Sequence, residues 1–281
     1  MLKLRDGIVE LYRKVATSLP PDVEEALKAA LPQEQPGSAA ASALAVVIEN
    51  IRTARETARP ICQDTGVPVF HVKVPLGLSQ NELRSTLVEA TRIATGQVPL
   101  RPNAVDVITE KNSGDNTGEG FPVIYFEEST TNTLAIDLML KGAGSENAGQ
   151  LYKLPDAELN AQRDLDGVRR CVLDAVHRAQ GRGCPPYIIG VGIGATKDQV
   201  TRLAKAQLFR KVADRNPVDR LADLETMVLR EINELGIGPM GLGGRTTAIA
   251  VKIGANHRHP ASYFVDVSVG CWATRRGRLL W

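Results

Sequence analysis

The chain has 281 residues, a formal net charge of +2, 43% hydrophobic residues and only 4% aromatic residues. Near neutrality, and the lack of basic runs mixed with aromatics, argue against a nucleic-acid partner. The first residues contain no apolar segment of signal-peptide type, and no apolar stretch approaches membrane-spanning length. We therefore expect a cytoplasmic protein with reduced thiols and no membrane contact.

The first part of the chain is predicted to be helical, because apolar residues recur there at helical spacing. Pro60 ends this part, and an alternating strand follows it. The next helix has Ser79 at its N-cap and Glu82 at the capping-box position. In chain order, the elements predicted are helices over Asp6–Ser18, Pro21–Ala30 and Ala39–Ala58, a strand over Val67–Val74, and a helix over Ser79–Ala94.

The rest of the chain mixes strands and helices. We predict strands over Val105–Thr109, Phe121–Glu127, Thr133–Lys141, Tyr187–Gly194, Thr247–Ala255 and Ser262–Val269, and helices over 160–179, Thr196–Lys211 and Val218–Leu235. No internal repeat or low-complexity linker divides the sequence. The fold class expected is mixed α/β in a single domain, 1–281, with a helical portion to about residue 60 and a strand-and-helix portion from about residue 61.

Three of the four cysteines lie in turn-prone segments: Cys62, Cys184 and Cys271. Each is more than eighty residues from the next, so folding has to bring them together if they share a site. Three thiolates can hold a metal or cluster and leave one position open for substrate. The pattern alone does not choose between zinc, iron and coincidence. Cys171 lies within a predicted helix, and we interpret it as a packing residue.

Other loops combine glycine with charged or polar residues, as binding loops often do. Arg101 precedes Pro102, which favours an extended backbone, and its guanidinium could bind a carboxylate. The glycines of Lys141–Asn147 could form an anion-binding nest or a plain turn. His257 and His259 could be ligands, acid–base groups or solvated loop residues.

Two glycine patterns have nucleotide-binding alternatives. Gly190–Ala195 fits the dinucleotide fingerprint formally, but the repeating strand–helix pattern of that fold is missing. Gly236–Thr247 is as rich in glycine as a phosphate loop, yet it lacks the Gly-Lys-Ser/Thr ending and leads into a strand. A glycine-rich wall that approaches a ligand closely fits it better.

Five motifs, in this order, resemble those of the class I (iron–sulfur) fumarate hydratases, and more closely the separate α subunit of the two-subunit form. The related L(+)-tartrate dehydratase α subunit shares them, and the resemblance covers essentially the whole chain. The motifs are Cys62-Gln63-Asp64-Thr65-Gly66, Lys141-Gly142-Ala143-Gly144-Ser145-Glu146-Asn147, Gly183-Cys184-Pro185-Pro186, Gly241-Leu242-Gly243-Gly244-Arg245-Thr246-Thr247 and Cys271-Trp272-Ala273-Thr274-Arg275-Arg276.

The resemblance implies a [4Fe–4S] cluster held by Cys62, Cys184 and Cys271, with the fourth iron left for substrate. Such a site differs from a ferredoxin, whose clusters use four cysteines. The implied reaction is the reversible hydration of fumarate to (S)-malate, a hydro-lyase step of the tricarboxylic acid cycle. The open iron would act as a Lewis acid on the substrate hydroxyl and a carboxylate oxygen.

By the same resemblance, Gln63, Arg101 and Gly144 bind the dicarboxylate substrate. Asp64 and His259 are the implied catalytic pair that handles the hydroxyl proton, with His257 as the fallback. The remaining substrate cations and the proton-abstracting residue lie in a C-terminal domain of the family, so we expect a β subunit in an α2β2 heteromer. The alternatives are an L(+)-tartrate dehydratase α subunit, a non-catalytic iron–sulfur scaffold or sensor, and the nicotinamide enzyme of Gly190–Ala195.

Overall fold

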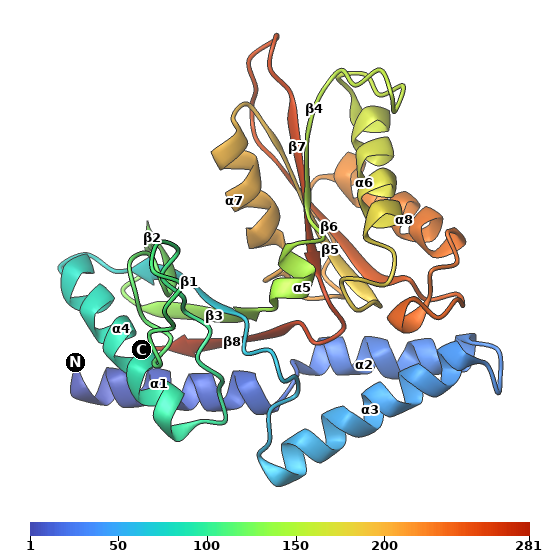
Figure 1. Cartoon of the computed structure of the whole chain (residues 1–281). Coiled ribbons are helices and arrows are strands. Elements are labelled where there is room, and N and C mark those ends of the chain that lie inside the picture. The colour runs from blue at the N-terminus through green and yellow to red at the C-terminus, as the bar shows by residue number, and fades with distance from the viewer. The chain divides into compact units, whose positions relative to one another are not determined.

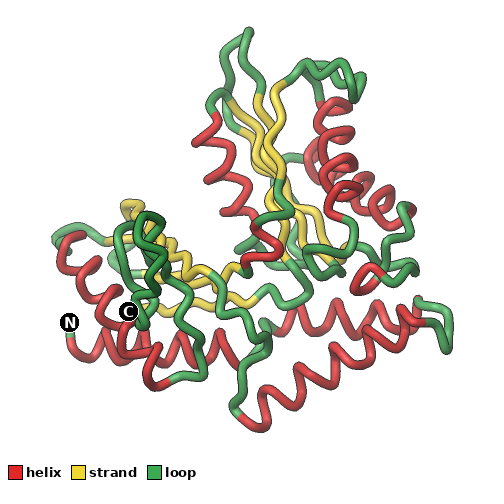
Figure 2. The backbone as a smooth tube through the Cα atoms, in the orientation of Figure 1, coloured by secondary structure: helices red, strands yellow, loops and turns green.

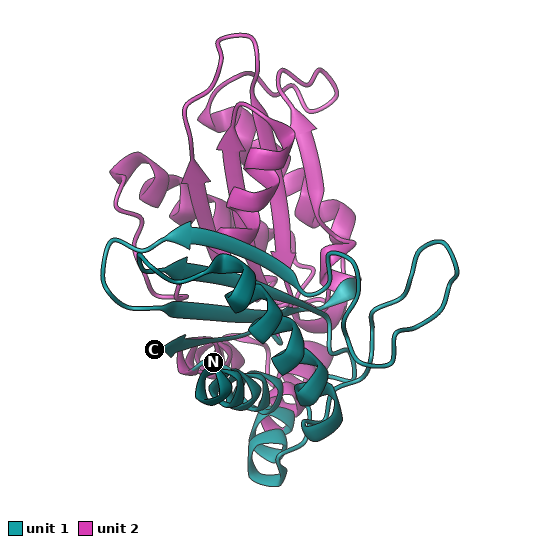
Figure 3. Ribbon diagram, turned by 90° about the vertical axis from the view of Figure 1, so that its left-hand side faces the viewer, with its two compact units in different colours: residues 1–20, 50–143, 273–281 teal, residues 21–49, 144–272 magenta.

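The computed structural model describes residues 1–281 and divides them into two compact units, coloured separately in Figure 3. Unit 1 comprises residues 1–20, 50–143 and 273–281, and unit 2 comprises residues 21–49 and 144–272. Each unit has a four-stranded sheet of its own. The mixed α/β class is confirmed, with helices at the start and sheets after them (Figure 1). The single domain expected over 1–281 stays a prediction, and the units are described one at a time.

Unit 1 packs two helices against its sheet, whose strand order is β2-β1-β3-β8. β1 runs parallel to β2 and antiparallel to β3, and β3 pairs antiparallel with β8. The core includes Ile8 and Tyr12 of α1 and Leu87 of α4, none of them exposed. The unit's elements are α1 (Leu2–Thr17), β1 (Val67–Val74), α4 (Gln80–Gln97), β2 (Val123–Glu128), β3 (Ala135–Lys141) and β8 (Arg275–Leu280).

Unit 2 places its sheet, in the order β4-β7-β5-β6, between α7 on one face and α6 with α8 on the other (Figure 1). β5 is parallel to β6 and antiparallel to β7. The elements are α2 (Pro21–Ala30), η1 (Leu31–Gln33), β4 (Gln150–Lys153), α6 (Leu165–Ala179), β5 (Tyr187–Gly194), α7 (Lys197–Gln207), α8 (Asp219–Glu234), η2 (Pro239–Gly241), β6 (Ala248–Ala255) and β7 (Phe264–Gly270); α3 (Ala39–Thr57) and α5 (Ala143–Glu146) cross the unit boundaries.

The glycines of β5 allow α7 to lie directly on the strand. A Cβ atom on Gly190 would be 2.2 Å from the carbonyl oxygen of Ala204, and one on Gly192 would be 2.1 Å from that of Val200. No side chain fits at such distances, so only glycine permits this close helix–strand packing. The formal dinucleotide fingerprint at Gly190–Ala195 therefore has a packing explanation within unit 2.

Most of the predicted elements are confirmed, and two kinds of error occur. The strand predicted over Val105–Thr109 is wrong: the chain between α4 and β2 is drawn as loop in Figure 2, and its only β pairing is two isolated bridges, Val105 with Asn112 and Gly118 with Phe121. The Asp106 carboxylate in this segment accepts hydrogen bonds from the backbone N–H groups of Ile108 and Thr109. These hydrogen bonds stabilise a turn in place of a strand. β4 and β8 were not predicted. None of the helices combines the length and apolar character that a membrane span needs.

Candidate functional site

In unit 1, Asp64 connects three segments of the predicted site. Its Oδ1 accepts hydrogen bonds from Gly66 N (2.8 Å) and from Asn103 Nδ2 (3.1 Å), and its Oδ2 accepts one from Ala143 N (2.8 Å). The N–H groups therefore come from its own turn, from the segment after Arg101 and from the loop after β3. A carboxylate with several N–H partners is fixed in orientation. In the glycine loop, Ala143 N therefore binds the Asp64 carboxylate, an anionic side chain of the protein itself.

The turn after Asp64 requires glycine. Gly66 has a φ of +77°, and a Cβ there would be 2.5 Å from the carbonyl oxygen of Lys141. Any other residue at this position would combine backbone strain with a clash against the end of β3. The Cys62–Gly66 motif is thus held against β3 by its backbone, with Cys62 half-buried and Gln63 exposed.

The backbone of Arg101 is bound on both sides, while its side chain is exposed. Its N–H donates to Thr65 Oγ1 (2.6 Å), and its carbonyl accepts from Asn116 Nδ2 (3.0 Å). The guanidinium extends into solvent from this fixed backbone. Unit 1 therefore brings together Gln63, Asp64 and Arg101, as far as their backbones are concerned. An exposed guanidinium on a rigid segment can bind a carboxylate at low entropic cost.

Arg275 is a site-associated residue to which the sequence motif assigned no role. It opens β8 but is only 1% exposed, and its Nη2 donates to the carbonyl oxygen of Asp64 at 2.8 Å. Its Nε has no hydrogen-bond partner, and no carboxylate pairs with it. A buried arginine without a carboxylate is unusual, because the desolvated charge is normally paired. Here the guanidinium supports the backbone of the Asp64 turn instead.

In unit 2, the motifs of Cys184 and Cys271 lie side by side. Trp272 N donates to the carbonyl oxygen of Cys184 at 3.0 Å, so the residue after one cysteine contacts the other cysteine directly. Both cysteines are half-buried, and neither forms a disulfide. Burial raises the pKa of Tyr187 to about 12, and the neighbouring Cys184 and Cys271 add to the rise. Cys184 has a φ of +58°, a strained conformation of the kind often kept at functional sites.

The glycine-rich loop of unit 2 packs against the Cys184 turn through backbone atoms. Met240 N donates to the carbonyl oxygen of Pro185 at 2.8 Å, and a Cβ on Gly241 would be 2.6 Å from Cα of Gly181. The buried carboxylate of Glu34 holds the other end of this loop, because it accepts from Arg245 N (2.9 Å) and Thr246 N (2.8 Å). The glycine-rich loop therefore lies beside Cys184, one of the three predicted cluster ligands.

Two other residues predicted for the site, Gly144 and His259, are less closely connected to Cys184 and Cys271 than these cysteines are to each other. Gly144 is exposed, and a Cβ there would make an ordinary contact, 3.5 Å from the carbonyl oxygen of Arg182. His259 lies in the exposed loop between β6 and β7, whereas Cys271 follows the opposite end of β7. Unit 2 therefore separates His259 from Cys184 and Cys271 by the length of its sheet.

The half-buried thiols are donors of the type that iron–sulfur clusters use. No group of three or more histidine, cysteine or acidic side chains comes together as a site for a metal ion. Of the three half-buried cysteines, Cys62 lies in unit 1, and Cys184 and Cys271 lie in unit 2. Thiolates are the usual ligands of iron–sulfur clusters, and close glycine backbones leave room for a bulky group. Cys171 is buried in α6, where desolvation raises the pKa of its thiol to about 12, so it packs as predicted.

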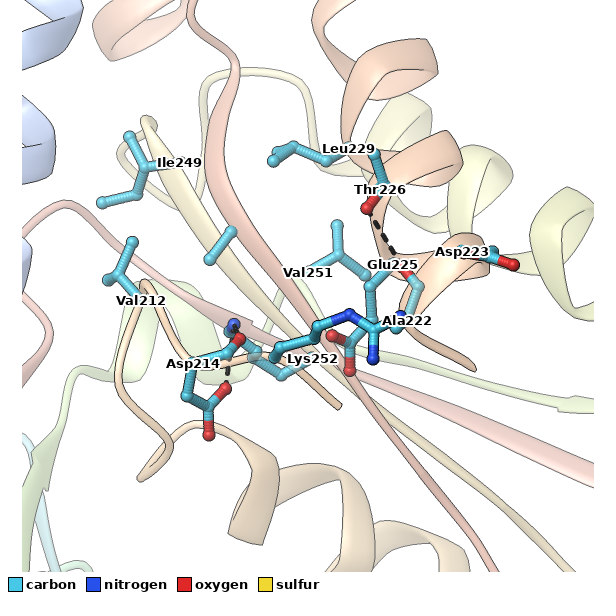
Figure 4. A pocket seen from close by; sticks show the side chains of 12 residues that line it. Val212, Asp214, Ala222, Asp223, Glu225, Thr226, Leu229, Ile249, Val251 and Lys252 are labelled. Carbon is cyan, nitrogen blue, oxygen red and sulfur yellow. Dashed lines mark hydrogen bonds and ion pairs between the residues drawn. The ribbon is translucent and has the colours of Figure 1, made fainter. Parts of the chain in front are cut away.

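Unit 2 also contains a cavity of about 270 Å³ between α8 and β6 (Figure 4). Lys252, Asp214 and Glu225, which line it, all have ion-pair partners. Lys252 Nζ lies 3.0 Å from Asp214 Oδ1, and Glu225 Oε1 accepts from Arg210 Nη1 at 2.8 Å. None of the predicted site residues lines it, so we interpret these charges as a structural network.

Known proteins are similar to this chain over nearly its whole length. Residues 5–279 match the family described as "Fumarate hydratase (Fumerase)". The chain is 48% identical over 280 residues to "Putative fumarate hydratase class I" of Geobacillus stearothermophilus, covering 98% of this chain and 54% of that protein. It thus spans about half the length of that relative.

Two other relatives match it over nearly their full length. The chain is 39% identical over 280 residues to "Putative L(+)-tartrate dehydratase subunit alpha" of Methanocaldococcus jannaschii, covering 98% of this chain and 96% of that protein. It is 34% identical over 283 residues to "L(+)-tartrate dehydratase subunit alpha" of Escherichia coli K12, covering 99% and 90%. With a match from residue 5 to residue 279, the chain belongs to the fumarate hydratase family.

Proposed function

We propose that this chain is the α subunit of an iron–sulfur hydro-lyase that hydrates fumarate reversibly to (S)-malate. The observation that carries the proposal is the hydrogen bond from Trp272 N to the Cys184 carbonyl, which puts two of the three predicted ligands side by side within one unit. The class I fumarate hydratase relative, at 48% identity, supports fumarate as substrate.

Cys62, Cys184 and Cys271 would hold a [4Fe–4S] cluster. When bound, an iron with an open position supplies Lewis-acid polarisation of the substrate oxygens. The half-buried thiols support this assignment, because reduced cysteines bind as thiolates and none of these forms a disulfide. A cytoplasmic location would keep them reduced.

The substrate would be held and deprotonated by side chains of the α and β subunits together. In α, Arg101 would pair with a substrate carboxylate, with Gln63 and the backbone at Gly144 as further contacts. Asp64, oriented by three N–H donors, would form a pair with His259 that takes or returns the hydroxyl proton. The remaining cations and the proton-abstracting residue would come from a β subunit, which the α-subunit names of two relatives support.

The assembly proposed is an α2β2 heteromer that acts in the tricarboxylic acid cycle. The test is anaerobic: purify α with its co-expressed β subunit, reconstitute iron and sulfide, and measure absorbance change with (S)-malate and with L(+)-tartrate. We expect malate turnover only when α, β and cluster are all present. Full activity of cluster-loaded α alone would disprove the need for β, and no turnover of either substrate would disprove the hydro-lyase function.

The second candidate is the α subunit of an L(+)-tartrate dehydratase, because relatives with that name match at 39% and 34% identity over nearly their full length. The same assay separates the two, since the larger kcat/KM identifies the substrate. A scaffold or sensor is less well supported, because such a protein does not need the fixed backbone and exposed guanidinium of Arg101.

A further inference from the structure

We propose that Glu34 is a positioning residue for Cys184: its buried carboxylate fills an anion-binding nest in the glycine-rich loop Gly236–Thr247, and the filled nest holds the turn that carries the cysteine. This role rests on the proposed function, in which Cys184 is a cluster ligand. Glu34 lies outside all five motifs of the sequence. Glu34, the loop and the Cys184 turn all belong to unit 2.

The nest consists of two successive backbone N–H groups near the end of the loop. Glu34 Oε2 accepts a hydrogen bond from Arg245 N at 2.9 Å, and Oε1 accepts one from Thr246 N at 2.8 Å. Successive N–H groups that converge on one point bind anions. Glu34 is only 4% exposed, and its partners are backbone N–H groups rather than lysine or arginine side chains. A buried carboxylate needs such donors, so the carboxylate and the nest stabilise each other.

The loop packs closely around this carboxylate and against itself. Gly244 has a φ of +113°, and a Cβ there would be 2.5 Å from Glu34 Oε2 and 2.7 Å from the Cβ of Ala40. A Cβ on Gly238 would collide with the carbonyl group of Gly243. Only glycine permits such approaches, so the two arms of the loop touch through their backbones. Movement at the nest therefore requires movement of the whole loop.

The loop in turn contacts the chain on both sides of Cys184. After the cysteine, Tyr187 N donates to the carbonyl oxygen of Thr247 at 2.8 Å, and Thr247 directly follows the nest. Before the cysteine, the Cα of Gly181 is so close to Gly241 that a Cβ on Gly241 would be 2.6 Å away. The turn that carries Cys184 is thus held at both ends by the loop that Glu34 fixes.

The backbone of Cys184 needs this support, because its φ of +58° is unfavourable for a residue with a side chain. Such a conformation persists only where the surrounding structure fixes it. Cys184 N donates to the carbonyl oxygen of Gly181 at 3.1 Å, and the Cys184 carbonyl accepts from Trp272 N at 3.0 Å. The glycine-rich loop adds contacts on both sides of these hydrogen bonds. Loss of the nest should therefore let Cys184 relax from its strained conformation.

Thiol alkylation in the cluster-free α chain tests the role of Glu34. Iodoacetamide is added to the reduced protein under anaerobic conditions, and mass spectrometry measures the modification rate of each cysteine. In Glu34→Ala we expect alkylation of Cys184 to accelerate about tenfold, the change expected when local opening becomes easier by one hydrogen bond. Cys62 and Cys171 should keep their wild-type rates, because neither contacts the loop.

Rescue by acetate separates a filled nest from a general packing role. The atoms that Glu34→Ala removes are those of acetate, so acetate should occupy the nest and restore the slow alkylation of Cys184, whereas chloride at equal ionic strength should not. Glu225→Ala is the matched control, since Glu225 is also buried in unit 2 but accepts a hydrogen bond from Ile253 N of β6, at 2.7 Å. This variant should leave Cys184 at its wild-type rate, with or without acetate.

An unchanged Cys184 rate in Glu34→Ala, or an accelerated rate that acetate does not lower, would overturn the proposal. If Cys171 also reacts faster, unit 2 has unfolded, and Glu34→Gln decides instead, because it keeps the side-chain volume but replaces one carboxylate oxygen with an NH2 group. Faster alkylation confined to Cys184 in Glu34→Gln supports the role of Glu34, and a wild-type rate contradicts it. The alkylation needs no cluster, so the proposed function fails separately, if Cys184→Ser retains its iron.

Discussion

At the residue scale, Asp64 is fixed by both its side chain and its backbone. Three N–H groups bind the carboxylate, and the guanidinium of Arg275 binds the carbonyl oxygen. Hydrogen bonds within unit 1 therefore fix the orientation of this residue, two positions from the predicted ligand Cys62. Preorganisation of this kind lets a catalytic group act without the cost of reorientation.

Replacement of Arg275 should loosen this turn. Arg275→Met keeps much of the buried aliphatic volume but removes the donor, and a hydrogen bond to a charged group contributes roughly 1.5–3 kcal/mol. We expect faster amide hydrogen exchange at Thr65 and Gly66 in the cluster-free chain, with unchanged helix content by circular dichroism. Arg275→Lys, which keeps a donor, should show a smaller effect.

Arg278→Met is the matched control, since Arg278 lies on the same strand and pairs with Asp137 at the surface. Surface pairs contribute about 0–1 kcal/mol, so this variant should leave the exchange of residues 62–66 unchanged. Equal exchange rates in Arg275→Met and the wild type would show that Arg275 does not support the Asp64 turn.

At the element scale, the contact between α7 and β5 depends on glycine. Gly192→Ala would put a Cβ 2.1 Å from the Val200 carbonyl oxygen and 2.7 Å from Ala204 N. Overpacking of this kind typically costs about 1–3 kcal/mol. We expect the free energy of unfolding, measured by urea titration, to fall by at least that amount.

Gly96→Ala provides the opposite control. Gly96 lies in α4 with no atom within 4 Å of an added Cβ, so alanine there should stabilise the chain by up to about 1 kcal/mol. If Gly192→Ala were as stable as the wild type, the glycines of β5 would need another explanation, and nucleotide binding would have to be tested.

The sequence predicts elements well where one local signal dominates. β5 is apolar along its length and α2 begins at Pro21, and both were predicted with the observed bounds. Val105–Thr109 alternates like a strand, yet Asp106 closes a turn there. β8 was missed because its arginines resemble a solvated tail, although pairing with β3 buries Arg275.

The residues of the candidate site could be predicted from sequence where they lie within recognisable motifs. Cys62, Asp64 and Arg101 carry recognisable neighbours in sequence, and unit 1 brings their segments together. Glu34 and Arg275 were not predicted, because each hydrogen-bonds to the backbone of a residue 211 positions away in sequence. No local sequence pattern marks such a contact. The place of His259 follows only from the strand register.

At the scale of the whole molecule, neither unit is continuous in sequence. Unit 1 is assembled from three segments, the last of which, residues 273–281, contributes the edge strand β8. β8 pairs with β3 and contacts α1, so it closes both the sheet and the core of that unit. Folding of unit 1 therefore depends on the final residues of the chain.

Deletion of residues 273–281 should destabilise unit 1 more than unit 2. It removes a sheet partner of β3 and the Arg275 contact to Asp64. Limited proteolysis with mass spectrometry should show early cleavage near β3 and the Cys62–Gly66 turn, with α6, α7 and α8 still protected. Equal protection of both units in the truncated and full-length chains would contradict this dependence.

The central proposal is that Cys62, Cys184 and Cys271 bind one iron–sulfur cluster. Its most direct test is the iron and acid-labile sulfide content, with the visible spectrum, of anaerobically reconstituted αβ heteromers carrying Cys62→Ser, Cys184→Ser, Cys271→Ser or Cys171→Ser. We expect about four irons per α chain and a broad brown absorption in the wild type and in Cys171→Ser, and loss of both in the other three variants. Iron retained in any of those three, or lost in Cys171→Ser, would contradict the assignment.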